Sequence, residues 1–199
     1  SELTQGYCAT CGYRELVSPR SDHPCPSGSF LDMPALGHWA HEGIDYCVAR
    51  GLMQGVSADL FCPNSSITRG QLVTILYRMA GSPSVSSRSG YSDVPAGQYY
   101  SNPVAWASAR GIVTGLPDGT FQPDAPITRE QLASILWRYA GSPAASGSLF
   151  HYPDSASVGD YARSALIWAT QVGLIQGTQN GVKTYLEPQQ QASRAKFAV

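Results

Sequence analysis

A threefold internal repeat is the feature that most constrains how this chain can fold. Each copy opens with an aromatic residue two positions before an aspartate and leads to a hydroxyl residue followed by arginine. The three spans are Phe30 to Arg69, Tyr91 to Arg129 and Tyr152 to Arg194. Such a period is typical of a supersecondary unit that cannot bury its apolar face alone. We therefore expect function to lie between the copies.

The repeat also divides the chain. Between Trp39 and Pro83, many residues recur identically at a constant offset of 60 positions. Linkers of small residues follow the first two copies, at 82–90 and 142–148. The sequence thus predicts a Cys-containing irregular leader and three repeats, at 1–29, 30–83, 91–143 and 152–199. In the third repeat, we expect a truncated second helix, because the given sequence ends at Val199.

Each copy reads as helix, loop, helix, so we expect a mainly α fold of three tandem units. Apolar residues recur at helical spacing after Trp39, and Gly51 marks the end of that helix. The second helix starts with Thr68 and Gln71 in the spacing of a capping box, and Thr128 repeats the pattern with Gln131. Phe61, Phe121 and Tyr185 are expected to anchor each loop on its own helix pair.

Composition excludes several classes of function. The chain is 43% hydrophobic, 14% charged and has a formal net charge of −1, which argues against nucleic-acid binding. No apolar run is long enough to span a bilayer. The sequence has no G-x-S-x-G, H-E-x-x-H or P-loop motif, so we expect a noncatalytic protein without a cofactor. Whether it begins after a removed signal or is an excised segment stays open.

The arginine that follows each hydroxyl residue has two interpretations. Arg69, Arg129 and Arg194 occupy the first position of a helix, where backbone N–H groups lack intrahelical partners. In a structural interpretation, each arginine packs across a neighbouring copy and meets an aspartate. In a binding interpretation, the guanidinium grips a carboxylate or phosphate, and the helix end adds N–H donors. The aspartates concerned are Asp32, Asp93 and Asp154.

These motifs together resemble the S-layer homology domain. The resemblance rests on Phe-x-Asp, His-Trp-Ala, Gly-Leu-Met-x-Gly, Phe-x-Pro and Ile-Thr-Arg, and it covers all but the leader and linkers. It implies a pseudo-threefold helical assembly that anchors exported proteins to the bacterial cell surface. The partner that it implies is secondary cell wall polysaccharide, an anionic polymer bearing ketal-pyruvate groups.

The resemblance also implies which residues bind the sugar. Family members use the arginine of a Thr-Arg-Ala-Glu motif, in grooves between repeats, with help from the glycine-rich loop. The corresponding ligand-binding residues here are Arg69, Arg129, Arg194, Gly55, Gly115 and Gly177, with Asp32, Asp93 and Asp154 beside them. The alternative is a scaffold that binds a protein partner and uses these arginines as internal ion-pair partners.

Departures from the motif make the three grooves unequal. Its Ala-Glu pair is replaced by Gly70-Gln71 and Glu130-Gln131 in the first two copies, where glutamine preserves the cap. In the third copy, Lys196 stands at the reciprocal position of the box. We expect this third groove to be degenerate.

The five cysteines all precede Pro63 and leave their pairing open. Cys8, Cys11, His23 and Cys25 form a soft ligand set that suits structural zinc, whereas an exported protein favours disulfides. Cys47 and Cys62 are candidates for a disulfide within the first copy.

The aromatic residues suggest sugar stacking, but we assign most of them to the core. Trp106 and Trp168 take equivalent helix positions, and Trp39 and Trp137 are grouped with them. Tyr99 and Tyr100, at a helix start, are the expected exceptions.

Overall fold

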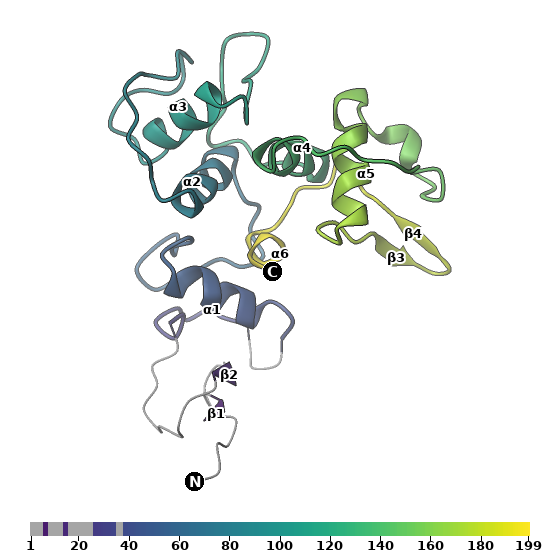
Figure 1. Cartoon of the computed structure of the whole chain (residues 1–199). Coiled ribbons are helices and arrows are strands. Elements are labelled where there is room, and N and C mark those ends of the chain that lie inside the picture. The colour runs from purple at the N-terminus through teal and green to yellow at the C-terminus, as the bar shows by residue number, and fades with distance from the viewer. Residues whose placement is uncertain (1–5, 8–13, 16–25, 35–37) are drawn as a thin grey trace. The chain divides into compact units, whose positions relative to one another are not determined.

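The computed structural model describes residues 6–7, 14–15, 26–34 and 38–199 (Figure 1). The chain forms two compact units. Unit 1 comprises Ser1–Ser66 and Ser193–Val199, and unit 2 comprises Ile67–Ala192. The described elements are mainly helical, in three helix–loop–helix copies, as the sequence predicts.

Unit 1 joins the first helix of copy one to the second helix of copy three. Helix α1 (His41–Ala49) packs against α6 (Arg194–Ala198). A Cβ atom at Gly43 would lie 2.6 Å from the carbonyl oxygen of Ala198, so only glycine permits this approach. In the leader, β1 (Gly6–Tyr7) pairs antiparallel with β2 (Arg14–Glu15).

Unit 2 is built from two helix pairs. Helix α2 (Arg69–Met79) packs against α3 (Ser101–Ala109), and α4 (Arg129–Tyr139) packs against α5 (Arg163–Gln171). The 3-10 helices η1 (Ser155–Ser157) and η2 (Asp160–Ala162) precede α5. The second helix of one copy therefore packs against the first helix of the next, so the two helices of one copy do not form the packed pair on which we expected the loop to close.

A ring of three backbone hydrogen bonds lies inside unit 2. The N–H of Ile67 donates to Ala192 O at 2.9 Å, Ala192 to Ile127 O at 3.0 Å, and Ile127 to Ile67 O at 3.0 Å. Each of these residues directly precedes the hydroxyl-Arg step of its copy, and all three are buried. The ring gives the three copies a cyclic relation at the points where their second helices begin.

The predicted capping boxes are confirmed in the first two copies. Thr68 Oγ1 accepts the Gln71 N–H at 3.2 Å, and Gln71 Oε1 accepts the Thr68 N–H at 3.2 Å. Thr128 and Gln131 form the same reciprocal pair. In the third copy Ser193 caps the Lys196 N–H at 3.2 Å, and α6 has 5 residues against 11 in α2 and α4.

The third copy replaces a short loop with a hairpin that we did not predict. Strands β3 (Thr178–Asn180) and β4 (Lys183–Tyr185) pair antiparallel, with Asn180 opposite Lys183. Gly181, with φ +61°, begins the two-residue turn, as glycine does in a type II′ connection. Among the described helices none is long and apolar enough to cross a membrane.

The hairpin also corrects the third loop anchor. Phe61 and Phe121 are fully buried and each precedes a residue with positive φ, Cys62 or Gln122. In the third copy that place belongs to Leu186, which is fully buried and precedes Glu187 at φ 51°. Tyr185 lies at the end of β4, so the hairpin moves the anchor one residue along the chain.

The predicted disulfide between Cys47 and Cys62 is not formed, since both are free thiols. Cys47 faces α6, with its Sγ 3.8 Å from the carbonyl oxygen of Ala198. Cys62 is held in the loop because its N–H donates to Asp32 Oδ2 at 2.7 Å. The two side chains thus serve different contacts within unit 1, and burial raises the pKa of the Cys47 thiol.

Replacing Thr68 with alanine should lower the free energy of unfolding by about 1 kcal/mol, because the Gln71 N–H loses its acceptor. Denaturant unfolding followed by circular dichroism measures this loss. Thr68→Ser keeps the hydroxyl and should stay near the wild-type midpoint. Equal destabilisation by serine and alanine would contradict the capping role.

Candidate functional site

Each second helix begins with a buried arginine that reaches the loop of the next copy. Arg69 Nε donates to Phe121 O at 2.8 Å, and Arg129 Nε donates to Leu186 O at 2.8 Å. Within unit 1, Arg194 Nε donates to Phe61 O at 2.9 Å. Relative exposure is 8%, 8% and 3% for Arg69, Arg129 and Arg194, so these are cations held inside the protein.

The remaining guanidinium donors are used differently in the three copies. Arg129 Nη2 donates to Gln176 O at 2.9 Å, and Arg194 Nη2 donates to Gln54 O at 2.6 Å. For Arg69, the Nε bond is the only hydrogen bond that its side chain forms to the described residues. Arg69 therefore keeps its Nη donors for another partner, while its Cζ lies 4.7 Å from the ring centroid of Phe121.

Among the described residues, no carboxylate forms a direct ion pair with Arg69 or Arg129. Burial lowers the pKa of both guanidinium groups, with Asp93 acting against the shift at Arg69 and Glu187 at Arg129. Both stay charged, since the ordinary arginine pKa is so high. Among the described residues neither forms an ion pair within 4.0 Å. The direct Arg–Asp contact of the structural interpretation is therefore not formed at these two positions.

The three repeated aspartates brace the loops through both carboxylate oxygens. Asp93 accepts the N–H groups of Phe121 at 2.8 Å and Gln122 at 2.7 Å. Asp32 accepts from Phe61 and Cys62, and Asp154 accepts from Leu186 and Glu187, in the same arrangement. In unit 2, Phe121 thus links the two side chains: its N–H donates to Asp93, and its carbonyl oxygen accepts from Arg69.

The helix ends do not offer their N–H groups to a ligand, which corrects one part of the binding interpretation. The Arg69 N–H donates to Ala125 O at 3.0 Å, and the Gly70 N–H donates to Pro123 O at 2.8 Å. Arg129 and Glu130 donate likewise to Gln190 O and Pro188 O. Since the loop carbonyls satisfy these donors, anion binding here would depend on the guanidinium group.

The repeated loop glycines make room for an aromatic ring of their own copy. A Cβ atom at Gly55 would overlap Phe30, and one at Gly115 would overlap Tyr91. A Cβ atom at Gly177 would overlap Thr184 and lie 3.2 Å from Tyr152. This packing explains why each copy opens with an aromatic residue. Gly115 also has a backbone φ of +68°, which residues other than glycine rarely adopt.

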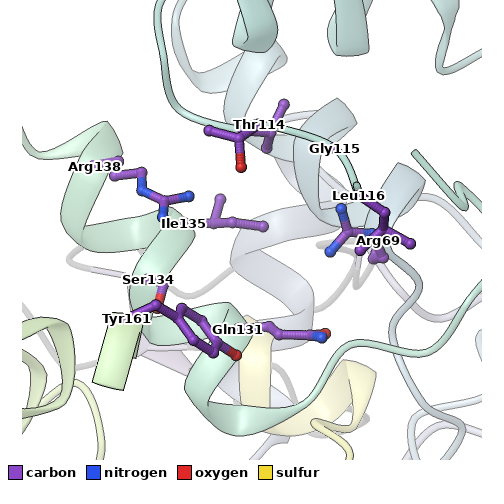
Figure 2. A pocket seen from close by; sticks show the side chains of 10 residues that line it. Arg69, Thr114, Gly115, Leu116, Gln131, Ser134, Ile135, Arg138 and Tyr161 are labelled. Carbon is purple, nitrogen blue, oxygen red and sulfur yellow. The ribbon is translucent and has the colours of Figure 1, made fainter. Parts of the chain in front are cut away.

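A pocket of about 300 Å³ lies beside Arg69, within unit 2 (Figure 2). Thr114, Gly115 and Leu116 contribute the loop wall. Helix α4 contributes Gln131, Ser134, Ile135 and Arg138, while Val113 and Tyr161 complete the lining. Of the predicted site residues, the structure brings Arg69 and Gly115 together in this pocket.

Tyr161 is a pocket residue that sequence reasoning missed. Its hydroxyl donates to Glu130 Oε1 at 2.8 Å, and the Gly159 N–H donates to Glu130 Oε2 at 2.9 Å. Burial and the Glu130 carboxylate raise the pKa of Tyr161, so the phenol stays a donor. The hydrogen bond to Glu130 fixes the hydroxyl of Tyr161, which is 51% exposed, so the ring forms a fixed wall of the pocket.

A signal for Tyr161 was present in the repeat. It stands seven residues before Trp168, as Tyr99 stands seven before Trp106. Tyr99 is 54% exposed, as expected, whereas Tyr100 is buried, contrary to expectation. Trp106 is buried as predicted, while Trp39 is 55% exposed and the core assignment for it is wrong.

The zinc candidates Cys8, Cys11, His23 and Cys25 lie outside the described residues. Within the described ranges, no group of three or more His, Cys, Asp or Glu side chains is placed to hold a metal ion.

Comparison with known proteins identifies the repeats. The model of the S-layer homology domain matches residues 29–73, 90–133 and 151–198, which together exceed half of the chain. Over 84% of the present chain, the sequence is 29% identical to the Surface-layer 125 kDa protein of Lysinibacillus sphaericus. Over 81% of the present chain, it is 27% identical to the Amylopullulanase of Thermoanaerobacterium thermosulfurigenes. Over 59% of the present chain, it is 25% identical to a Cellulosome-anchoring protein of Acetivibrio thermocellus.

The chain spans only a small part of these relatives. It covers 14% of the surface-layer protein, 9% of the amylopullulanase and 27% of the cellulosome-anchoring protein. What the relatives share with this chain is thus a module, carried by proteins with different names.

Replacing Asp93 with asparagine should lower the free energy of unfolding by about 2 kcal/mol, because two backbone N–H groups lose a charged acceptor. Denaturant unfolding gives the value. Asp124→Asn removes the same charge from an exposed side chain and should change stability little. Equal effects of the two substitutions would contradict the bracing role of Asp93.

Proposed function

The chain belongs to the S-layer homology domain family, and on that premise we propose that it is a noncatalytic module binding ketal-pyruvylated secondary cell wall polysaccharide. In this proposal it anchors an exported bacterial protein to the cell wall. Relatives named as surface-layer and cellulosome-anchoring proteins support a role at the cell surface.

The pocket beside Arg69 is the observation that carries the proposal. Arg69 is buried and positively charged, and its Nε donates to the Phe121 carbonyl oxygen, so its Nη donors can bind a ligand. A planar guanidinium binds a carboxylate through two parallel hydrogen bonds, and burial strengthens such bonds. The carboxylate of a ketal-pyruvyl group is an anion of this kind.

The other residues enter the proposal with unequal weight. Arg129 and Arg194 each give an Nη donor to a loop carbonyl, so they have fewer donors left for a ligand than Arg69 has. Gly115 lines the Arg69 pocket, and Gly55 and Gly177 occupy the corresponding loops. We propose that Asp32, Asp93 and Asp154 act by fixing these loops, since both oxygens of each carboxylate hold backbone N–H groups.

The alternative is a protein-binding scaffold that uses the arginines as internal ion-pair partners. At Arg69 and Arg129 this alternative lacks support, because neither has a carboxylate within 4.0 Å among the described residues. A pull-down that recovers a protein partner, with no retention on wall polysaccharide, would favour the scaffold.

Replacing Arg69 with alanine should weaken binding to purified pyruvylated wall polysaccharide by about tenfold or more, because the charge-assisted bonds are lost. Isothermal titration calorimetry measures the change, and circular dichroism should show unchanged helix content. Arg110→Ala removes a positive charge from an exposed residue outside the pocket and should leave affinity unchanged.

Chemical removal of the pyruvyl groups provides the matched ligand control. It should weaken wild-type binding but add little to the Arg69→Ala defect, since both changes break one contact. Full retention of binding by an Arg69→Ala, Arg129→Ala double variant would overturn the proposal.

A further inference from the structure

We propose that Arg138 is a second anion-binding residue of the Arg69 pocket, so that the bound polysaccharide segment carries two separate acidic groups. This inference rests on the proposed function, which accounts for one acidic group at Arg69. It adds a requirement on the chemistry of the ligand, namely a second negative charge on a neighbouring part of the same segment.

The two guanidinium groups approach the pocket from different elements. Arg69 begins α2, and Arg138 lies in the last turn of α4. Figure 2 shows their side chains on opposite sides of the pocket, with Ile135 between them. An apolar side chain between two cations favours a ligand that places one anion at each side and a ring carbon surface in the middle.

The pocket lining has no carboxylate to neutralise these cations. Glu130 is near but buried, and its two oxygens accept the Tyr161 hydroxyl and the Gly159 N–H. Among the described residues, Arg138 forms no ion pair within 4.0 Å. Its positive charge acts to lower the pKa of Tyr161, against the larger effect of burial, so Arg138 is close to the Tyr161 wall.

Two uncompensated cations on one concave surface focus a positive potential there. That potential attracts an anionic ligand, and the attraction grows with each acidic group that the ligand brings into the pocket. Thr114, on the loop wall, adds a hydroxyl that can bond a neutral sugar hydroxyl. The pocket therefore suits an acidic saccharide with one acidic group on each of two adjoining rings.

Arg138 also has a structural explanation, since a cation in the last turn of a helix is favoured by the helix dipole. Arg138→Gln should therefore lower the melting temperature slightly, and only the binding measurements below test the second anion site.

Two synthetic disaccharides test the inference on the whole chain. The first carries a ketal-pyruvyl group on one ring and a uronic acid carboxylate on the other, and the second is its uronate methyl ester. By calorimetry at low ionic strength, the wild type should bind the diacid about five- to tenfold more tightly than the ester. Arg138→Gln should bind both with equal affinity, close to that of the wild type for the ester.

Control variants separate this inference from the proposed function. Arg69→Gln should weaken binding of both disaccharides, and Arg110→Gln should leave the preference for the diacid intact. Equal wild-type affinity for diacid and ester would overturn the second anion site while leaving the proposed function in place. No wild-type binding of either disaccharide would overturn both.

Discussion

The ring of backbone hydrogen bonds among Ile67, Ile127 and Ala192 is the constraint on which the rest of unit 2 depends. Each ring residue is followed by the cap and then by the arginine of its copy. The ring therefore sets where α2 and α4 begin and directs Arg69 and Arg129 toward the following loops. Because it is made by peptide groups, alanine serves at position 192 where isoleucine serves at 67 and 127.

The helices and their caps could be predicted because their causes are local. A capping box needs only residues three positions apart, and Thr68 with Gln71 provides it. The pairing of helices could not, because periodicity shows which face a helix buries and not which partner covers it. The Cys47 contact to Ala198 and the shift of the loop anchor to Leu186 depend on such distant partners.

The candidate site was predictable to the extent that it repeats. Arg69 and Gly115 recur in every copy, so the repeat alone singles them out. Tyr161 and Arg138 have counterparts in Tyr99 and Arg78, but recurrence at these positions does not distinguish a pocket residue from a surface residue. They become pocket residues only when the start of α2, the loop at Gly115, α4 and the approach to α5 meet in one place.

The sequence copies and the packed helix pairs are out of phase, and this offset affects how such a chain can change. The linker at 82–90 joins α2 to α3, which pack together, and the linker at 142–148 joins α4 to α5, which also pack together. Exchange of one whole copy between related chains would break two helix pairs at once. Exchange of the segment from one arginine to the next would instead transfer an intact helix pair together with its joining linker.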